Sequence, residues 1–354
     1  MHLFYRVFII SSLLIIAQSC DSGASTEEVE EQFFTKESEE DSYFTALQSI
    51  ENAIAQNPDD IELLINKAKL AKANLDFKNA LDAGAKAFVK DSTNIDARKI
   101  YAWTLINKPQ APVGDIDRAK RHYKYVLSVE PNNLEIMIEY ANAHALTGDF
   151  ESSFKLINDV LRKNDKYRDA YILKGSNYKV IGNYELALSS YQTAVMLDPS
   201  YFMAQLQTGY LLTEMENHGL AVEYYRNAAD LDPESIEALY GVAKSLQDMG
   251  EFDKAQAVYR DILAVDESFF IAYFNQGFIK QYLQNQPDSA VYYYNLCLDT
   301  QPEYVKAWYQ LGETYITLDR NVDAARAFAQ ALTLNPDYEP ALIAKEKLRP
   351  KLRP

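Results

Sequence analysis

The sequence predicts an all-α fold, a solenoid of helical hairpins stacked in a single continuous array. One observation is a pattern of small and large apolar residues that recurs about every 34 residues over most of the chain. A fixed period of that length is typical of helical repeat proteins. A second is the composition, since 48% hydrophobic and 24% charged residues among 354 are typical of a folded soluble protein. The composition therefore excludes a wholly disordered, collagen-like or polytopic membrane chain.

Charge and cysteine content narrow the class of function. The 51 acidic and 35 basic side chains give a formal net charge of -16. A surface this acidic repels phosphate backbones, so we expect no nucleic-acid partner. The two cysteines, Cys20 and Cys297, are too few for a disulfide scaffold and lie in unrelated contexts.

The first element is an export signal, residues 1–19. A positively charged start precedes an apolar run at residues 7–17, which is too short to span a membrane but fits a secretory signal. With Ser19 directly before Cys20, the segment resembles a bacterial lipoprotein signal, although the two residues before Ser19 differ from the usual ones. The resemblance implies cleavage before Cys20, attachment of lipid such as palmitate to this cysteine, and anchoring to a membrane. The alternative is an ordinary signal peptide with an incidental cysteine.

The next element, residues 20–42, is predicted to be a lipidated cysteine followed by a disordered acidic tether. Residues 21–41 contain nine acidic side chains and one basic, and such a stretch cannot bury enough apolar surface to fold. An acidic run after the lipid cysteine resembles the surface-export signals of Bacteroidota lipoproteins. Asp21, directly after the cysteine, instead resembles the inner-membrane retention signal of enterobacteria. We expect a location in the bacterial cell envelope and favour the outer membrane, on either its periplasmic or its surface face.

Residues 43–60 are predicted to be an N-terminal half repeat. They supply one amphipathic helix at residues 43–56, which ends before Pro58. The acidic segment before it has no pattern for a partner helix. We therefore expect a lone second helix ahead of the first full hairpin.

Eight full repeats span residues 61–338, each with a helix A and a helix B. They begin at Ile61, Ile95, Leu134, Arg168, Phe202, Ile236, Phe270 and Val305. Counted from each start, positions 8 and 20 hold only Gly, Ala or Ser, while position 24 is large in seven repeats. Small residues let helices A and B cross closely, and the large residue fills the space between successive hairpins.

The last repeat carries the most complete motif. Trp308, Leu311, Gly312, Tyr315, Ala324, Phe328, Ala331 and Pro336 fall at positions 4, 7, 8, 11, 20, 24, 27 and 32. This pattern resembles the tetratricopeptide repeat (TPR), and the same frame recurs in the other seven repeats. The resemblance implies a superhelix of hairpins in which helix A of each repeat lines a concave groove.

Glycines and insertions mark the ends of helices. Gly148, Gly182 and Gly250 lie between helices A and B, where glycine can adopt the left-handed conformation that ends a helix. The repeat from Ile95 has five extra residues at 108–115, and the repeat from Phe270 has one extra near Gln286.

Residues 339–354 are predicted to be a C-terminal capping helix and tail. The helix covers residues 339–348, with Ala341, Leu342 and Leu348 on its apolar side. A terminal helix with a polar outer face is what a solenoid needs at its end.

The sequence offers little chemistry. His144 and Cys297 occupy positions 11 and 27 of their repeats, which are packing positions, so we expect both to be structural. No metal-binding, nucleophile or phosphate-binding motif occurs. We therefore expect no enzyme activity, no catalytic or metal-binding residue and no small-molecule cofactor.

Partner binding is the function that remains. Positions 2, 5, 9 and 12 of helix A face one direction. In the C-terminal half they are rich in aromatic residues, whereas in the first repeats only Trp103 stands out. The candidate partner-binding residues are Tyr210, Tyr240, Lys244, Phe274, Asn275, Phe278, Lys306 and Tyr309. Aromatic platforms between polar groups are typical of peptide grooves. The alternative is that these rings only pack between neighbouring A helices.

One TPR subtype clamps a C-terminal carboxylate with five polar side chains. Only Asn275 and Lys306 match its positions here, so this subtype is not favoured. The sequence instead predicts a membrane-anchored scaffold that binds an envelope protein or peptide segment, as an adaptor in a secretion, assembly or motility complex. The alternative is a surface lipoprotein that captures a glycan or another solute. Proteins of that class carry a large non-repeat region, and none is present in this sequence.

Overall fold

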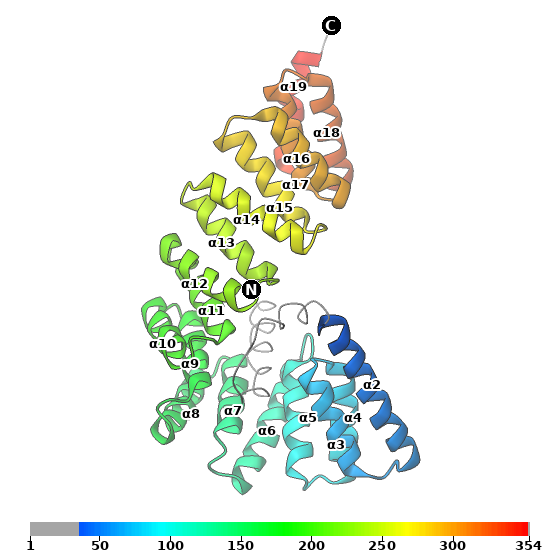
Figure 1. Cartoon of the computed structure of the whole chain (residues 1–354), viewed down its shortest axis with the longest axis vertical. Coiled ribbons are helices and arrows are strands. Elements are labelled where there is room, and N and C mark those ends of the chain that lie inside the picture. Colours follow the sequence, from blue (N-terminus) through cyan, green and yellow to red (C-terminus); the bar gives the residue numbers. More distant parts are fainter. Residues whose placement is uncertain (1–34, 353–354) are drawn as a thin grey trace, which may run out of the picture. The chain divides into compact units, whose positions relative to one another are not determined.

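The computed structural model of the protein describes residues 35–352, and every regular element in that range is helical (Figure 1). The predicted all-α solenoid of helical hairpins is confirmed. The expected signal peptide, Cys20 and the tether up to residue 34 lie outside the described residues. None of the described helices is both long and apolar enough to cross a membrane.

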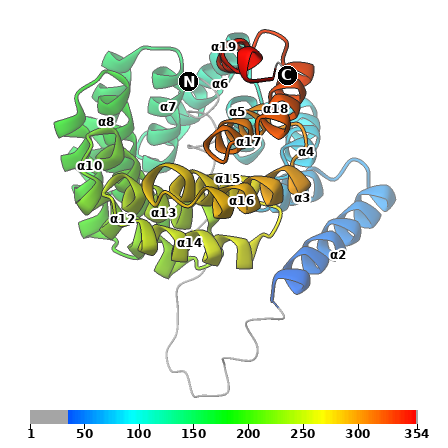
Figure 2. The same ribbon diagram turned by 90° about the horizontal axis from the view of Figure 1, so that it is seen from above.

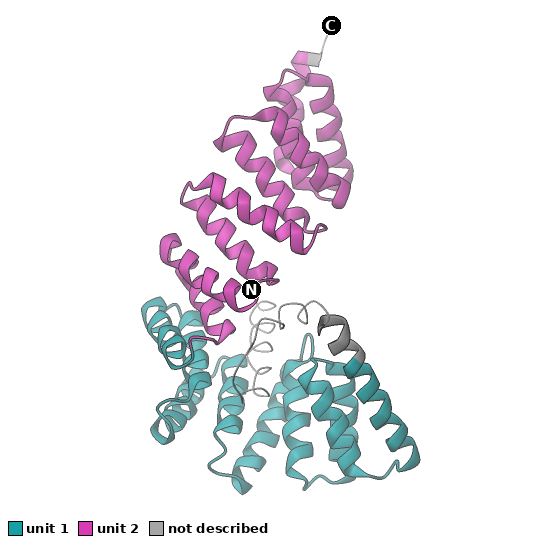
Figure 3. Ribbon diagram, viewed as in Figure 1, with its two compact units in different colours: residues 1–198 teal, residues 199–354 magenta. Residues whose placement is uncertain are grey.

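The chain divides into two compact units, residues 1–198 and 199–354, and the boundary falls in the turn between two repeats (Figure 3). The helices described in the first unit are α2 (Thr35–Gln56), α3 (Ile61–Ala73), α4 (Phe77–Lys90), α5 (Ile95–Asn107), α6 (Val113–Val129), α7 (Leu134–Leu146), α8 (Phe150–Lys163), α9 (Arg168–Val180) and α10 (Tyr184–Leu197).

The second unit continues the same pattern of hairpins. Its elements are α11 (Phe202–Glu214), α12 (His218–Leu231), α13 (Ile236–Asp248), α14 (Phe252–Val265), α15 (Phe270–Phe278), the π-helix η3 (Ile279–Leu283), α16 (Pro287–Thr300), α17 (Val305–Thr317), α18 (Asn321–Leu334), α19 (Glu339–Leu348) and the 3-10 helix η4 (Arg349–Leu352). Consecutive helices pair as hairpins, as α15 and α16 do where they lie side by side in Figure 2.

Side-chain caps mark the starts of four of the eight A helices, α3, α5, α7 and α13. All eight A helices begin at the residues from which the repeat was counted. Asp60, Asn94 and Asn133 precede α3, α5 and α7, and each side chain accepts hydrogen bonds from backbone N–H groups of the first turn. Such a cap is worth about 1 kcal/mol. The period and the caps therefore specify the same boundaries.

The contact between positions 8 and 24 explains why position 8 is small. In four hairpins glycine at position 8 faces the ring at position 24. A Cβ atom added to Gly175, Gly209, Gly277 or Gly312 would lie 2.4–2.7 Å from that ring. The rings are buried, and four of the five tyrosine hydroxyls at this position bond to helix A of the same hairpin, as when Tyr294 donates to Gln281 Oε1 at 2.8 Å.

Helix α2 is longer than the sequence predicted. The expected helix began at residue 43, but α2 begins at Thr35 and so includes the last part of the acidic segment. Glutamate is a good helix former, and acidic residues are favourable near the positive N-terminal end of a helix. The prediction of a disordered segment was based on its charge and did not consider its helix propensity. Further along α2, Tyr43 donates to Asp76 Oδ2 at 2.8 Å and Glu51 pairs with Lys67 at 2.6 Å, so the helix covers the first hairpin.

The one-residue insertion in the repeat from Phe270 is absorbed inside helix A. Its last turn is the π-helix η3, and Asn285 behind it has a φ of 51°. A π-turn holds one more residue than an α-turn, so helix A lengthens by one residue and the start of α16 keeps its place. The sequence argument had placed this residue later, near Gln286.

The C-terminal helix α19 spans the predicted residues, with Ala341 and Leu348 buried against α18 and its neighbours. Leu342 was expected on the same apolar side but is 44% exposed. It directly follows Ala341 on a ten-residue helix, so its side chain points about 100° away from the packed face.

Candidate partner-binding surface

The residues predicted to bind a partner all lie on A helices of residues 199–354. They come from α11, α13, α15 and α17, at repeat positions 2, 5, 6 and 9. We call this side of the unit its A-helix face. Contacts between side chains connect the four helices along that face, and they decide how much of each residue is available to a partner.

Tyr210 of α11 is half-buried and contacts the next A helix. Its hydroxyl donates to Glu237 of α13, and its ring stands edge-on to Tyr225 at 5.6 Å. Burial and the Glu237 carboxylate raise the pKa of Tyr210 well above its usual value. The hydroxyl is therefore a fixed, neutral donor that joins α11 to α13.

Tyr240 and Asn275 join α13 to α15. The Asn275 amide donates to the Tyr240 hydroxyl at 3.5 Å, a long hydrogen bond. The Tyr240 ring also lies 6.0 Å from Phe269, the residue before α15. Asn275 is only 9% exposed, so it can position Tyr240 but offers little surface of its own. Lys244 forms an ion pair with Asp248 one turn along the same helix, so its charge is partly neutralised.

Phe274 and Phe278 lie one turn apart on α15 and have different surroundings. Phe274 packs at 5.2 Å on Tyr304 and at 5.8 Å on Tyr294, within the hydrophobic core of this unit. Phe278 has one ring neighbour, Tyr282 of η3, at 4.9 Å. The expected alternative, packing between hairpins, therefore describes Phe274 better than Phe278.

Tyr309 and Lys306 complete the set on α17. The Tyr309 ring lies 6.0 Å from Phe328 and 5.8 Å from Tyr338, and it is partly exposed. Lys306 is exposed and is in no salt bridge found among the described residues.

Three further residues belong to this face, and Tyr282 among them was not predicted. Tyr282 is 49% exposed and its hydroxyl donates to Gln310 Oε1 of α17 at 2.7 Å. Glu313, one turn beyond Gln310, is half-buried, and this burial raises the pKa of its carboxyl. Gln310 and Asn275 both occupy position 6, which the expected set of face positions did not include. The signal for Tyr282 was the 35-residue spacing of its repeat, because the extra residue lies in η3 itself.

We call Tyr210, Tyr240, Phe274, Phe278, Tyr282 and Tyr309 the aromatic face. Each ring except that of Tyr282 is half-buried, and Tyr282 is exposed. Each therefore packs on a neighbour with one part and leaves another part open to a partner.

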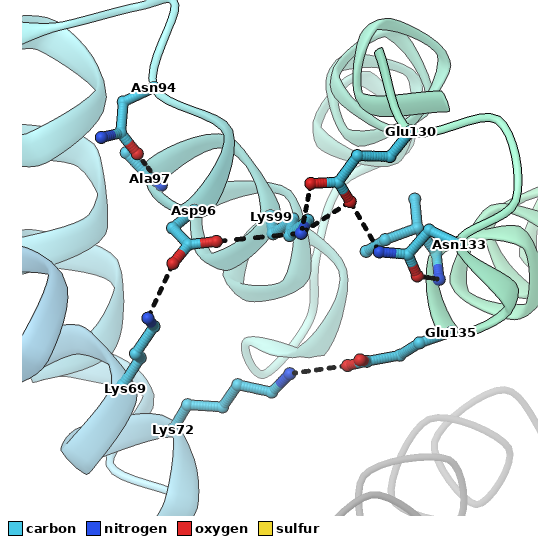
Figure 4. Close-up of polar contacts among 10 residues, drawn as sticks. Lys69, Lys72, Asn94, Asp96, Ala97, Lys99, Glu130, Asn133 and Glu135 are labelled. Atoms are coloured by element: carbon cyan, nitrogen blue, oxygen red, sulfur yellow. Dashed lines mark hydrogen bonds and ion pairs between the residues drawn. The ribbon is translucent and has the colours of Figure 1, made fainter. Parts of the chain in front are cut away.

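The A-helix face of residues 1–198 is charged instead. Lys69 of α3 pairs with Asp96 of α5 at 2.8 Å, and Lys99 of α5 pairs with Glu130 at 2.8 Å (Figure 4). Glu130 in turn accepts a 2.7 Å hydrogen bond from Asn133, the cap of α7. Lys72 extends from α3 toward Glu135 of α7, with Nζ 3.8 Å from the carboxylate (Figure 4). Exposed ion pairs add about 0–1 kcal/mol each, so this network mainly holds side chains in place.

The histidine and cysteine side chains that could be reactive are packed against neighbouring residues. His144 Nδ1 lies 2.8 Å from Asp149 Oδ2, next to the Tyr140 ring. His122 packs between Phe88 and Tyr101, and burial lowers its pKa to about 4. Cys297 is buried, which raises the pKa of its thiol to about 12. Within residues 35–352 no three metal-binding side chains come together.

Comparison with known families agrees with the fold. Three family models described as tetratricopeptide repeat match the chain, at residues 113–176 and 212–273, at 172–236, and at 305–338. Together these ranges cover more than half of the sequence. No curated protein matches it.

Two solved structures show the same architecture. The C-terminal part of a TPR repeat-containing protein from Cytophaga hutchinsonii has a TM-score of 0.60 at 17% identity, covering 71% of this chain and 99% of that one. A human IFIT1 dimer with PPP-AAAA has a TM-score of 0.56 at 16% identity, covering 87% of this chain and 78% of that one. At these identities the likeness concerns the fold alone.

Proposed function

The chain belongs to the tetratricopeptide repeat family, and from this premise we propose that it is a membrane-anchored scaffold that holds an envelope protein on its aromatic face. Repeats of this family are protein–protein interaction modules, and stacked repeats offer extended binding surfaces. The finer proposal concerns which surface is used, where the protein is held and what it binds.

The aromatic face is the observation that carries the choice of surface. Tyrosine is enriched among the residues that dominate binding energies, and partly exposed rings offer large contact areas at low entropic cost. Phe278, Tyr282 and Tyr309 lie on neighbouring A helices, and the Tyr282–Gln310 hydrogen bond fixes part of that surface before a partner arrives. Preorganised side chains lose less entropy on binding. A partner segment with apolar anchors separated by polar groups fits such a surface.

The anchor is proposed from residues 1–20. An apolar signal that ends directly before Cys20 supports lipid attachment to this cysteine, and the acidic residues after it support the outer membrane as the destination. Multiple acyl chains hold a protein on a membrane far more firmly than one. The Cys20→Ala variant should incorporate no radiolabelled palmitate, while the wild type is labelled. Equal labelling of the two proteins would contradict the anchor.

Partner capture tests the aromatic face. Crosslinked membranes from cells producing the wild type should yield a defined partner, identified by mass spectrometry. The Phe278→Ala and Tyr309→Ala variants should each weaken capture of that partner by about 30-fold, because truncating an anchor residue costs roughly 2 kcal/mol. Phe278 is preferred to Phe274 because Phe274 packs against the core and its truncation would also destabilise the unit.

Tyr292→Ala is the matched control. Tyr292 is 61% exposed on α16, the B helix of the hairpin that carries Phe278, so its loss removes a similar ring from a different side. The control should capture the partner as the wild type does. If all three variants capture it equally, or if the control is the one that fails, the proposed surface is wrong.

A further inference from the structure

A group of buried polar side chains in residues 1–198 has no hydrogen-bond partners. Glu139 of α7 is 4% exposed, and neither of its carboxylate oxygens has a partner. Asn142, one turn further along α7, is 3% exposed, and both polar atoms of its amide are also without partners. Buried polar groups are nearly always bonded, and a buried carboxylate without a donor is destabilising. Their hydrogen bonds therefore have to come from water or from a partner.

Tyr123 and Lys72 act on the Glu139 carboxyl, and Lys72 links this group to Trp103. The hydroxyl of Tyr123 on α6 lies next to the Glu139 carboxyl, and the two groups affect each other's pKa. Trp103 of α5 is 2% exposed and its indole Nε1 has no acceptor. Lys72 of α3 has Nζ 5.1 Å from the Trp103 ring centre. Glu139, Asn142, Trp103 and Lys72 occupy positions 6, 9, 9 and 12 of their repeats, which all belong to the A-helix face.

Around Glu139, negatively charged groups outnumber positively charged ones. Three carboxylates, Glu135, Glu139 and Asp169, act on one another electrostatically. Lys72 is the cation that acts on Glu139, and its ion pair with Glu135 is long, at 3.8 Å. Arg168 pairs with Asp169 but also bonds Asp198 at 2.6 Å, so it is shared. With Glu139 ionised, the group lacks one positive charge. Burial and the neighbouring carboxylates raise the pKa of Glu139 to about 7, as expected for an anion without its counter-ion.

We propose that these residues form a socket for an arginine side chain of a partner polypeptide. A guanidinium group supplies the missing charge, and its planar set of N–H donors suits the two carboxylate oxygens of Glu139 and the amide oxygen of Asn142. Lys72 is a flexible side chain held by a weak contact, so an incoming guanidinium can replace it. Trp103 then offers its free N–H to a carbonyl of the partner backbone.

The socket and the aromatic face belong to different units of the chain. The residues of the socket all belong to residues 1–198, whereas the aromatic face belongs to residues 199–354, so either can fail without the other. The acidic residues alone would not show which ligand binds here. The unbonded oxygens of Glu139 and the unbonded amide of Asn142 are what specify a donor-rich cation.

Trp103 provides a direct assay. The chain has two tryptophans, and the Trp308→Phe variant leaves Trp103 as the single fluorescent reporter. The probes are acetyl-Gly-Ser-Arg-Ser-Gly-amide and the same peptide with citrulline, which has a similar shape but no charge. We expect the arginine peptide to change Trp103 emission in a saturable way in the millimolar range, and the citrulline peptide to bind about tenfold more weakly or less. Added salt should weaken the binding of the arginine peptide, because the contact is ionic.

Two variants in this background separate a socket from a structural group. Glu139→Gln keeps the shape of the side chain and removes its charge. It should therefore lower the affinity for the arginine peptide about tenfold, to that for the citrulline peptide. Its melting temperature should stay the same or rise, because the carboxylate has no hydrogen bond to lose. Glu185→Gln makes the same change at an exposed position on α10 and should bind as the parent does. The proposal is overturned if the arginine peptide gives no saturable signal, if both peptides bind equally, or if Glu139→Gln binds arginine as before.

Discussion

The Gly241→Ala substitution should destabilise residues 199–354 although it adds a single methyl group. Gly241 lies at the start of the second turn of α13, against Tyr225 of the preceding hairpin. A Cβ atom there would lie 2.6 Å from two ring carbons of Tyr225. Carbon atoms normally approach to about 3.5–4.0 Å, so the ring would have to retreat by about 1 Å.

Tyr225 has no room to retreat. It is 2% exposed on α12, which packs against both α11 and α13. On the α11 side it contacts Gly209, where an added Cβ would lie 2.7 Å from the same ring. Overpacking of this kind costs roughly 1–3 kcal/mol. Replacing glycine by alanine inside a helix returns about 1 kcal/mol. Because both sides of the ring are occupied, we expect the upper part of the range and a net loss of about 1–2 kcal/mol.

Gly219→Ala is the control for this prediction. Gly219 is a helical glycine on α12, the helix of Tyr225, and nothing lies within 4 Å of the position of an added Cβ. This variant should be as stable as the wild type or slightly more stable. Urea unfolding followed by circular dichroism on the full chain measures the difference between the two midpoints. If Gly241→Ala unfolds at the same urea concentration as Gly219→Ala, the packing argument is refuted.

Three further outcomes follow from packing and burial. Ala255→Leu, at the fully buried position 20 of α14, should cost roughly 1–3 kcal/mol through overpacking, and an unchanged melting temperature would contradict it. Cys297 should resist iodoacetamide at pH 8 in the folded chain and react after unfolding, because a thiol with a pKa near 12 carries almost no thiolate; labelling with equal rates in both states would count against this. The folded Glu139 carboxyl titrates near pH 7 and the free carboxyl near 4.5, so the folded state binds more protons between these values, and stability falls as pH rises through that window. The wild type should lose stability relative to Glu139→Gln between pH 5 and pH 7, and a constant difference between the two proteins would show that Glu139 does not titrate there.

The sequence was sufficient for the hairpins because several signals agree at each boundary. At α5, the period, the cap Asn94 and the small residue Ala102 all specify the same frame, and the helix begins where they place it. At α2, charge and helix propensity disagree, and the sequence argument followed the charge. At η3, the repeat spacing shows that one residue is inserted but locates it only to within a turn. A longer loop and a π-turn would give the same spacing.

The binding surface was predictable only in part. Repeat counting placed the eight candidate residues on four A helices of one unit, and the structure connects them through contacts such as Tyr240–Asn275. Counting could not tell Phe274, which lies in the core, from Phe278, which does not. The ring that buries Phe274 is Tyr304, which caps the next helix from a connecting turn and so lies outside the helical positions. Whether these residues bind a partner stays a prediction. Glu139 was not among the predicted residues.

Two sets of positions in each repeat are under different physical constraints. Positions 8, 20 and 24 meet inside the hairpin, where a change of one carbon atom alters the packing, as at Gly209 and Tyr225. Many residues at positions 2, 5, 6 and 9 of helix A keep part of their surface open to solvent, so these positions vary more in residue type. The two units differ at these positions. Residues 1–198 carry ion pairs and a buried carboxylate without a hydrogen-bond partner, whereas residues 199–354 carry partly exposed aromatic rings. A charged surface selects partners mainly by complementary charge, while an aromatic surface gains affinity from buried area. Binding to residues 1–198 should therefore weaken steeply with salt, and binding to residues 199–354 should not.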